Sequence, residues 1–324
     1  MTRVGIPRGL LFYRYFPLWE TFFEALDIEA VPSSPTTEET IRKGSKLVPT
    51  DLCLPVKIYF GHVESVKRDV DWLFIPRYIS VDPDAYMCPK LIGLPDMVLC
   101  AVDALPPLID LPIHCKAQGM GAEKAFYLEV GKLFSKDGKK IERAYEMAME
   151  RQRRFRKLLQ ERFPFEQALA LSRSPNLPER PKEDGKVRLG IIGRPYYVHD
   201  PLLRRSVAEQ VEARGCQLLT TEVLRDEEIE KGVAQLKKSV YWSFGREMVG
   251  SAIGFAKDDL IRGLVNLASF GCGQDSFNFE LIQHFTKGRI PILSLIFDEH
   301  VSSGGFTTRV EAFLEMIAQR RNQK

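Results

Sequence analysis

The sequence predicts an α/β protein that consists of two Rossmann-like parallel-sheet domains, joined by a long helix and a proline-rich linker. Two segments, residues 3–34 and residues 187–223, show the same succession: a short β run, a turn with proline and glycine, an amphipathic helix and a second β run. Each succession is the pattern of a β-α-β unit, whose strands lie in a parallel sheet. We therefore expect two similar domains related by duplication.

The first domain continues with one further strand and a long helix. Residues 71–78, "DWLFIPRY", form a short apolar run of the kind that is buried in a parallel sheet. Residues 139–171 keep apolar side chains near a period of 3.6 and contain no glycine. This pattern predicts one long helix over about residues 138–171, interrupted near Pro164.

Residues 172–186, "SRSPNLPERPKEDGK", are rich in proline and charge, which is typical of a linker. We expect the first domain to span residues 1–182, including the long helix and this linker, and the second to span residues 183–324. Two more apolar runs, residues 263–270 and 290–298, predict further strands of the second domain.

The composition indicates an ordinary globular protein. Of 324 residues, 44% are hydrophobic and 27% are charged. The net charge of +3, from 46 basic and 43 acidic residues, is too small to indicate a nucleic-acid partner. No apolar stretch approaches the roughly 20 residues of a membrane-spanning helix, and the N-terminal segment lacks the pattern of a signal peptide. We expect a cytoplasmic protein that contacts neither nucleic acid nor membrane.

Six cysteines are scattered along the chain without a CxxC pair. In a reducing compartment this distribution favours metal binding, redox chemistry or burial over disulfides. Cys272 directly follows the apolar run 263–270, and Cys88 follows the run 71–78 after a loop. Since ligands of open parallel sheets bind beyond the carboxyl ends of the strands, both cysteines are expected at a working surface.

Cys53 and Cys88 are each followed closely by a proline, Pro55 and Pro89, which favours the start of a helix. A helix N-terminus stabilises a thiolate, and so we expect lowered thiol pKa values at these positions. Glycines flank Cys272 and are expected to let amide groups approach its sulfur. These three cysteines can thus meet as ligands of a soft metal centre, but burial as three small core residues is an alternative that the spacing leaves open.

Other polar residues near these cysteines have two interpretations each. Cys115, after His114, either supplies a fourth ligand or is buried at a strand end. Lys57 lies one helical turn after Cys53 and either faces the centre or is solvated. Asp275 is expected to cap the helix that follows Cys272.

Two cysteines are expected to be structural. Cys100 is spaced as a core residue of a helix, and Cys216 begins a strand. In the turn that opens the second domain, "GRPYYVHDP" at residues 193–201, two tyrosines and His199 lie either near the cleft or in packing contacts.

Five segments resemble the stand-alone, activase-related members of the 2-hydroxyacyl-CoA dehydratase component D family. The segments, in chain order, are "VGIPRGLLFYRYFPLWETFFEAL", "DLCLPVKIYFGHV", "DWLFIPRYISVDPDAYMCPKLIGLPDM", "SFGCGQDS" and "FDEHVSSGGFTTRVEAFLEM". The resemblance extends over nearly the whole chain. It implies Rossmann-like domains with a [4Fe-4S] cluster in the cleft between them, held by three cysteines. By motif, these ligands correspond to Cys53, Cys88 and Cys272.

The resemblance also implies partners and chemistry. Family members receive single electrons from an ATP-hydrolysing iron-sulfur activator protein, and they dehydrate or reduce a substrate at an iron left open, with acyl-CoA as the substrate of the dehydratases. A related branch holds a larger, double-cubane cluster and reduces small molecules. This chain contains no P-loop, and so ATP chemistry is expected of a partner. A homodimer, or a heterodimer with a related subunit, is also implied.

Two other hypotheses about the function stand beside an iron-sulfur enzyme. The chain is either a non-catalytic cluster carrier or electron-transfer subunit, or a zinc-containing or cofactor-free α/β binding protein. Catalytic residues other than the cluster ligands are not identified from the sequence.

Overall fold

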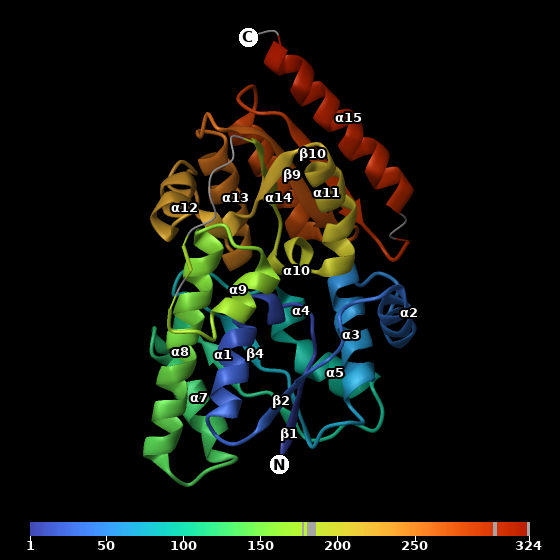
Figure 1. Ribbon diagram of the computed structural model, residues 1–324. Helices are drawn as coiled ribbons and strands as arrows, with labels where there is room; N and C mark the ends of the chain where they lie inside the picture. The colour runs from blue at the N-terminus through green and yellow to red at the C-terminus, as the bar shows by residue number, and fades with distance from the viewer. Residues whose placement is uncertain (177, 180–185, 301–302, 323–324) are drawn as a thin grey trace. The chain divides into compact units, whose positions relative to one another are not determined.

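The computed structural model describes residues 1–176, 178–179, 186–300 and 303–322, which form two compact units (Figure 1). Unit 1 comprises Met1–Leu158, Pro164–Pro178 and Tyr241–Ser243. Unit 2 comprises Leu159–Phe163, Glu179–Val240 and Phe244–Lys324. The expected boundary between residues 182 and 183 lies outside the described residues.

Unit 1 contains a parallel sheet of four strands in the order β2-β1-β3-β5, and β4 pairs with β6 in a small parallel sheet of two strands. The strands are β1 (Arg3–Ile6), β2 (Glu29–Pro32), β3 (Trp72–Phe74), β4 (Arg77–Ser80), β5 (Leu108–Ile109) and β6 (Pro112–His114). The opening succession β1, α1 (Phe12–Glu24), β2 is the predicted β-α-β unit.

Helices cover both faces of the sheet of unit 1. In Figure 1, α1, α7 and α8 lie on one side of its strands, and α2, α3 and α5 lie on the other. These and the remaining helices of the unit are α2 (Glu38–Leu47), α3 (Leu54–Val66), α4 (Pro89–Ile92), α5 (Leu94–Ala101), α6 (Cys115–Gln118), α7 (Ala122–Lys132), α8 (Gly138–Gln160) and α9 (Phe165–Leu171). On the α1 side the core is aromatic: Trp19 and Phe23 both pack edge-on against Phe74 of β3.

Unit 2 contains a second parallel sheet of four strands, in the order β10-β9-β7-β8. Its strands are β7 (Val187–Ile192), β8 (Cys216–Leu219), β9 (Ile261–Ser269) and β10 (Ile292–Phe297). Its helices are α10 (Pro195–Val198), α11 (Pro201–Ala213), α12 (Asp226–Val233), α13 (Ser243–Phe255), α14 (Gly273–Thr286), α15 (Ser303–Asn322) and a short 3-10 turn at Thr221–Val223. Helices α12, α13 and α14 lie on one side of the sheet and α11 and α15 on the other (Figure 1).

These sheets confirm the predicted α/β class with parallel sheets, and β9 and β10 match the expected strands closely. The run 71–78 was predicted as one strand, which is wrong. It forms β3 and β4, which belong to different sheets, and Pro76 separates them because proline has no N–H to donate to a ladder. The long helix ends at Gln160, and Pro164 is the residue that precedes α9.

No helix within the described ranges combines the length and the apolar character that crossing a membrane requires.

Helix α3, which begins directly after Cys53, is held by two buried polar side chains. The ammonium group of Lys57 donates to the carbonyl oxygen of Thr50, in the loop that leads to Cys53. The ring of His62 lies between the hydroxyls of Ser33 and Thr36, with a nitrogen 3.0 Å from each. Because one end of α3 is tied to its entry loop and its middle to the end of β2, the position of Cys53 is fixed from both sides.

Helices α2 and α3 pack unusually closely, with a glycine of each helix at the contact. A methyl group at Gly44 of α2 would overlap the carbonyl oxygen of Lys57, and one at Gly61 of α3 would overlap the carbonyl oxygen of Thr40. Backbone atoms cannot move aside as a flexible side chain can. The close approach of the two helices therefore requires both glycines.

We predict that Gly44→Ala lowers the free energy of unfolding of unit 1 by about 1–3 kcal/mol, because the added methyl group forces α2 away from α3. Gly138→Ala is the matched control, since a methyl group there, at the start of α8, meets no atom within 4 Å. Urea unfolding of the full chain, followed by circular dichroism, measures both effects. Equal unfolding curves for the two variants would contradict the account of this packing.

A second prediction concerns pH. Burial lowers the pKa of His62 from 6.5 to about 3, and the charge of Arg8 adds to this shift. Between these two values the unfolded chain binds a proton that the folded chain does not, so stability falls as the pH falls from 6.5 towards 3. His62→Gln, which keeps a donor and an acceptor, should reduce this pH dependence by up to about 1.4 kcal/mol per pH unit.

Unfolding free energies of wild type and His62→Gln at a series of pH values test this expectation. Near pH 8 the difference between their unfolding free energies should not change with pH, because His62 is neutral in both the folded and the unfolded chain there. If the curves of stability against pH run parallel from pH 8 down to pH 4.5, the buried neutral histidine does not contribute as described.

Candidate functional site

The two four-stranded sheets share a strand order that creates the same kind of crevice. In each sheet the first strand lies between the second and the third, as in β2-β1-β3 and β8-β7-β9. The second strand lies on one side of the first strand and the third strand lies on its other side. The turns that follow the first and the third strand therefore lead in opposite directions at the carboxyl edge of the sheet. Such a switch point is where open α/β sheets bind their ligands.

In unit 2 this position is occupied by Cys272 and Arg194. Cys272 follows β9 and is the residue that precedes α14, while Arg194 follows β7 and precedes α10. Gly271 has φ 72°, a conformation that permits the sharp turn from the strand into the helix. The side chain of Cys272 is buried, with 8% of its surface exposed.

Arg194 is buried and contacts four side chains through its two terminal nitrogens. Nη1 donates to the hydroxyl of Tyr196 over 3.0 Å and to the sulfur of Cys272 over 3.5 Å. Nη2 donates to Oε1 of Gln274 and forms an ion pair with Oδ1 of Asp275, both at 2.9 Å. The guanidinium thereby joins the turn after β7 to the first turn of α14.

Asp275 does not have the simple capping role that was expected of it. Its carboxylate pairs with Arg194 and, through Oδ2, accepts hydrogen bonds from the hydroxyl of Tyr197 and the backbone N–H of Ser269. The local position of Asp275, three residues into the helix after Cys272, suggested a cap because no sequence pattern records the distant arginine. Three groups, from the turn after β7 and from the end of β9, thus meet at this carboxylate.

The pKa of the Cys272 thiol is raised, chiefly by burial, although the positive charge of Arg194 opposes that shift. The Asp275 carboxylate adds to the rise, and the backbone N–H of Asp275 opposes it. A position directly before a helix therefore does not by itself lower the pKa of this thiol. The thiol is protonated at neutral pH, which argues against a free nucleophile and is compatible with a ligand that loses its proton on binding metal.

His199 and Glu222 form a second buried polar pair of unit 2. Nε2 of His199 lies 2.9 Å from Oε1 of Glu222. Although burial opposes ionisation, the interaction with His199 holds the pKa of Glu222 down at about 2. The tyrosines and the histidine of the opening turn are thus engaged in a polar network within unit 2.

Cys53 and Cys88, in unit 1, occupy the same local position as Cys272. Cys53 directly precedes α3, whose second residue is Pro55, and Cys88 directly precedes α4, whose first residue is Pro89. Each of the three cysteines is therefore the residue directly before a helix.

The remaining cysteines differ in their surroundings. Cys115 is buried directly after β6, and burial, with the charges of Glu123 and Asp82, raises the pKa of its thiol. Cys216 begins β8 and is partly buried, as expected. Cys100 is exposed, so its prediction as a core residue is wrong: its position on α5 faces away from the core.

Lys57 matches neither of its two interpretations fully. It is buried and not solvated, and its ammonium group donates to the carbonyl oxygen of Thr50. Arg194 was not among the site residues predicted from the sequence. The signal that points to it is an arginine directly after a buried strand and before a proline, at the carboxyl edge where the apolar pattern predicts no charge.

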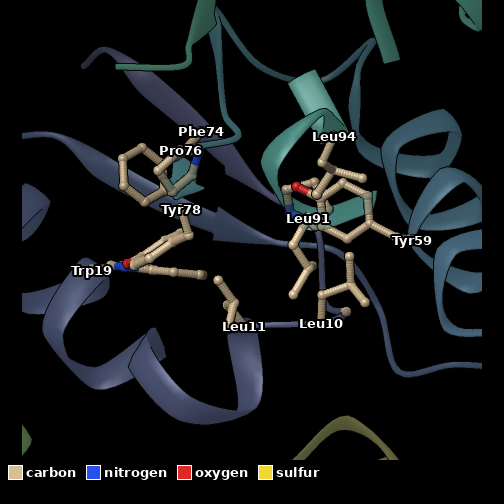
Figure 2. A pocket seen from close by; sticks show the side chains of 11 residues that line it. Leu10, Leu11, Trp19, Tyr59, Phe74, Pro76, Tyr78, Leu91 and Leu94 are labelled. Atoms are coloured by element: carbon tan, nitrogen blue, oxygen red, sulfur yellow. The ribbon is translucent and has the colours of Figure 1, made fainter. Parts of the chain in front are cut away.

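In unit 1 the corresponding crevice holds an apolar pocket (Figure 2). It is lined by Pro7, Gly9, Leu10, Leu11, Trp19, Tyr59, Phe74, Pro76, Tyr78, Leu91 and Leu94. Leu10 and Leu11 follow β1, Pro76 follows β3, and Leu91 belongs to α4, the helix that Cys88 begins. Burial raises the pKa of Tyr59 and Tyr78, so both phenols stay uncharged and the pocket suits an apolar group.

Neither unit by itself gathers three His, Cys, Asp or Glu side chains around one point, within the part of the chain that the structure describes. Cys53 and Cys88 belong to unit 1, and Cys272 belongs to unit 2. Their grouping as one ligand set stays a prediction. The donors themselves suit an iron-sulfur cluster, because all six cysteines lack a disulfide and Cys272 receives an N–H donor at its sulfur.

The sequence model of one protein family matches most of the chain. It is described as the CoA enzyme activase uncharacterised domain, and it matches residues 3–224, which include Cys53, Cys88 and Arg194. No curated protein shows significant similarity to the sequence. Since the match covers more than half of the 324 residues, the chain belongs to the family of CoA enzyme activase uncharacterised domains.

Proposed function

We propose that the protein is an iron-sulfur protein whose [4Fe-4S] cluster is held by Cys53, Cys88 and Cys272. The observation that carries this proposal is the shared local position of the three cysteines. Each directly precedes the first residue of a helix. Sulfur ligands in this setting are stabilised by the free N–H groups of the first helical turn.

Two buried cationic side chains contact the segments that carry Cys53 and Cys272. Lys57 fixes the loop that leads to Cys53, and Arg194 donates directly to the sulfur of Cys272. When bound, the cluster supplies one-electron chemistry and an iron with a position open to a further ligand. The chain itself supplies three thiols, of which those of Cys53 and Cys272 are buried and that of Cys88 is partly exposed.

The source of electrons is proposed to be an ATP-hydrolysing iron-sulfur activator protein. The family is named for an association with CoA enzyme activase. The sequence lacks the glycine-rich GxxxxGK[ST] motif that cradles nucleotide phosphates, and so we assign ATP hydrolysis to the activator and electron acceptance to this chain.

The substrate is proposed to be an acyl-CoA with a short acyl group, whose end occupies the apolar pocket of unit 1. The cavity has a volume of about 20 Å³, which is room for one or two carbon atoms. That pocket borders α4, the helix that begins after Cys88, through Leu91. Its two tyrosines are uncharged, so it favours a small apolar group over a carboxylate or phosphate. The reaction then is a reduction or a dehydration of the bound acyl group, in a homodimer or in a heterodimer with a related subunit.

A non-catalytic cluster carrier is the second candidate. It is favoured by unit 2, in which buried side chains of Arg194, Gln274 and Asp275 occupy the switch point of the sheet. A larger, double-cubane cluster is less favoured, because Cys100 is exposed and Cys216 lies at the start of a strand.

We predict that Cys272→Ala, Cys53→Ala and Cys88→Ala each abolish or strongly reduce cluster loading, because each removes one of three ligands. Cys216→Ala and Cys100→Ala are the matched controls and should load as wild type does. Iron and acid-labile sulfide per chain, measured after anaerobic reconstitution, give the result. Equal loading of Cys272→Ala and Cys216→Ala would overturn the ligand assignment.

We also predict that an acyl-CoA with a short acyl group binds roughly 4-fold more tightly than CoA, since burial of one CH₂ contributes about 0.8 kcal/mol, and that longer acyl groups gain little more, because the cavity has a volume of about 20 Å³. Leu94→Phe, which fills the pocket, should remove this gain but leave binding of CoA unchanged. Leu99→Phe is the control, because Leu99 lies on the same helix and is exposed. Calorimetry that finds equal affinities for CoA and for every acyl-CoA would exclude the pocket as the acyl site.

A further inference from the structure

We propose that Arg194 is a positioning residue, which holds the sulfur of Cys272 in place and raises the reduction potential of the centre that Cys272 serves. This inference rests on the proposed function. It assigns to a residue outside the ligand set the control of how readily the centre accepts an electron.

The burial of Arg194 is the first argument. Only 3% of the side chain of Arg194 is exposed, and 1% of that of Asp275. A buried cation is costly unless negative or polar groups surround it, and Asp275 supplies one full negative charge. An ionised Cys272, 3.5 Å from Nη1, would add a second negative charge at the same guanidinium. The guanidinium is therefore placed to stabilise negative charge on the sulfur.

The fork of the guanidinium is the second argument. Tyr196, Gln274 and Asp275 fix both terminal nitrogens, so the N–H that reaches Cys272 has a defined direction. A lysine at this position would keep the charge but could not contact all four groups, because its ammonium is a single point on a flexible stem. Position and charge can consequently be separated by substitution.

Arg194 also has a buried N–H donor, at Nε, that makes no hydrogen bond within the described residues. A guanidinium carries five N–H donors, and a buried donor without an acceptor is unfavourable. An acceptor that arrives with the centre, such as a sulfide, would satisfy it. The same side chain thus offers both a bond to a ligand sulfur and a donor still to be used.

The expected consequence follows from electrostatics. Reduction adds one electron to the centre and breaks no bond, with the activator protein as the reductant. A fixed positive charge a few ångströms away favours the reduced, more negative form, and hydrogen bonds to cluster sulfurs act in the same direction. Asp275 opposes this effect because its charge is negative. Arg194 and Asp275 should therefore shift the reduction potential in opposite directions.

The test is an anaerobic redox titration of the reconstituted full-length protein, followed by EPR and visible absorption. Arg194→Met should shift the potential to more negative values, Arg194→Lys should restore part of the shift, and Asp275→Asn should shift it to more positive values. Arg205→Met is the control, since Arg205 is an exposed arginine of the same unit, and it should match wild type.

Circular dichroism accompanies each titration, because loss of Arg194 leaves Asp275 buried without its cation. If Arg194→Met fails to fold, Arg194→Gln replaces it, because an amide can still donate to Asp275. If no variant of Arg194 loads a cluster, the Asp275→Asn variant decides. A shift of its reduction potential to more positive values supports the inference, and an unchanged potential contradicts it. A loaded Arg194→Met with the wild-type potential overturns this inference alone, whereas wild type without iron overturns the proposed function and the inference with it.

Discussion

The buried ion pair between Arg194 and Asp275 holds the carboxyl edge of unit 2 together. The two side chains come from turns separated by about eighty residues of sequence, and each would be costly to bury without the other. Their attraction ties the turn after β7 to the first turn of α14, and Arg194 also donates to the sulfur of Cys272, the residue before that helix.

In unit 1 different side chains fix the segment around the cysteine that precedes a helix. Lys57 fixes the loop before Cys53, His62 fixes the helix after it, and both side chains are buried. The switch point of the sheet holds a small apolar pocket, away from the two buried polar side chains. The two sheets share one strand order, but at this position one has apolar side chains and the other has a cation beside a sulfur.

Most of the fold could be predicted from the sequence, because strands and helices leave local patterns. The strands at residues 261–269 and 292–297 are mostly apolar, and the β-α-β openings repeat in both halves. The division of residues 71–78 was missed because the partners of each half lie in separate sheets, which the local pattern does not record. Cys100 was misjudged for a similar reason: spacing gives a helix face but not which face meets the core.

The candidate site was harder to predict. Arg194 and Asp275 pair because β7 and β9 are neighbours, and strand order is not encoded in either turn. Cys272 and Cys88 were selected because they follow apolar runs, and Cys53 and Cys88 because a nearby proline favours a helix start. The structure has all three directly before helices, but their grouping as one ligand set stays a prediction, since they belong to two units.

The most direct test of the account is the ratio of iron to acid-labile sulfide to protein after anaerobic purification and reconstitution. The account predicts iron and sulfide in equal amounts, with about four of each per chain. Stoichiometric zinc without iron, or neither iron nor sulfide, would contradict it.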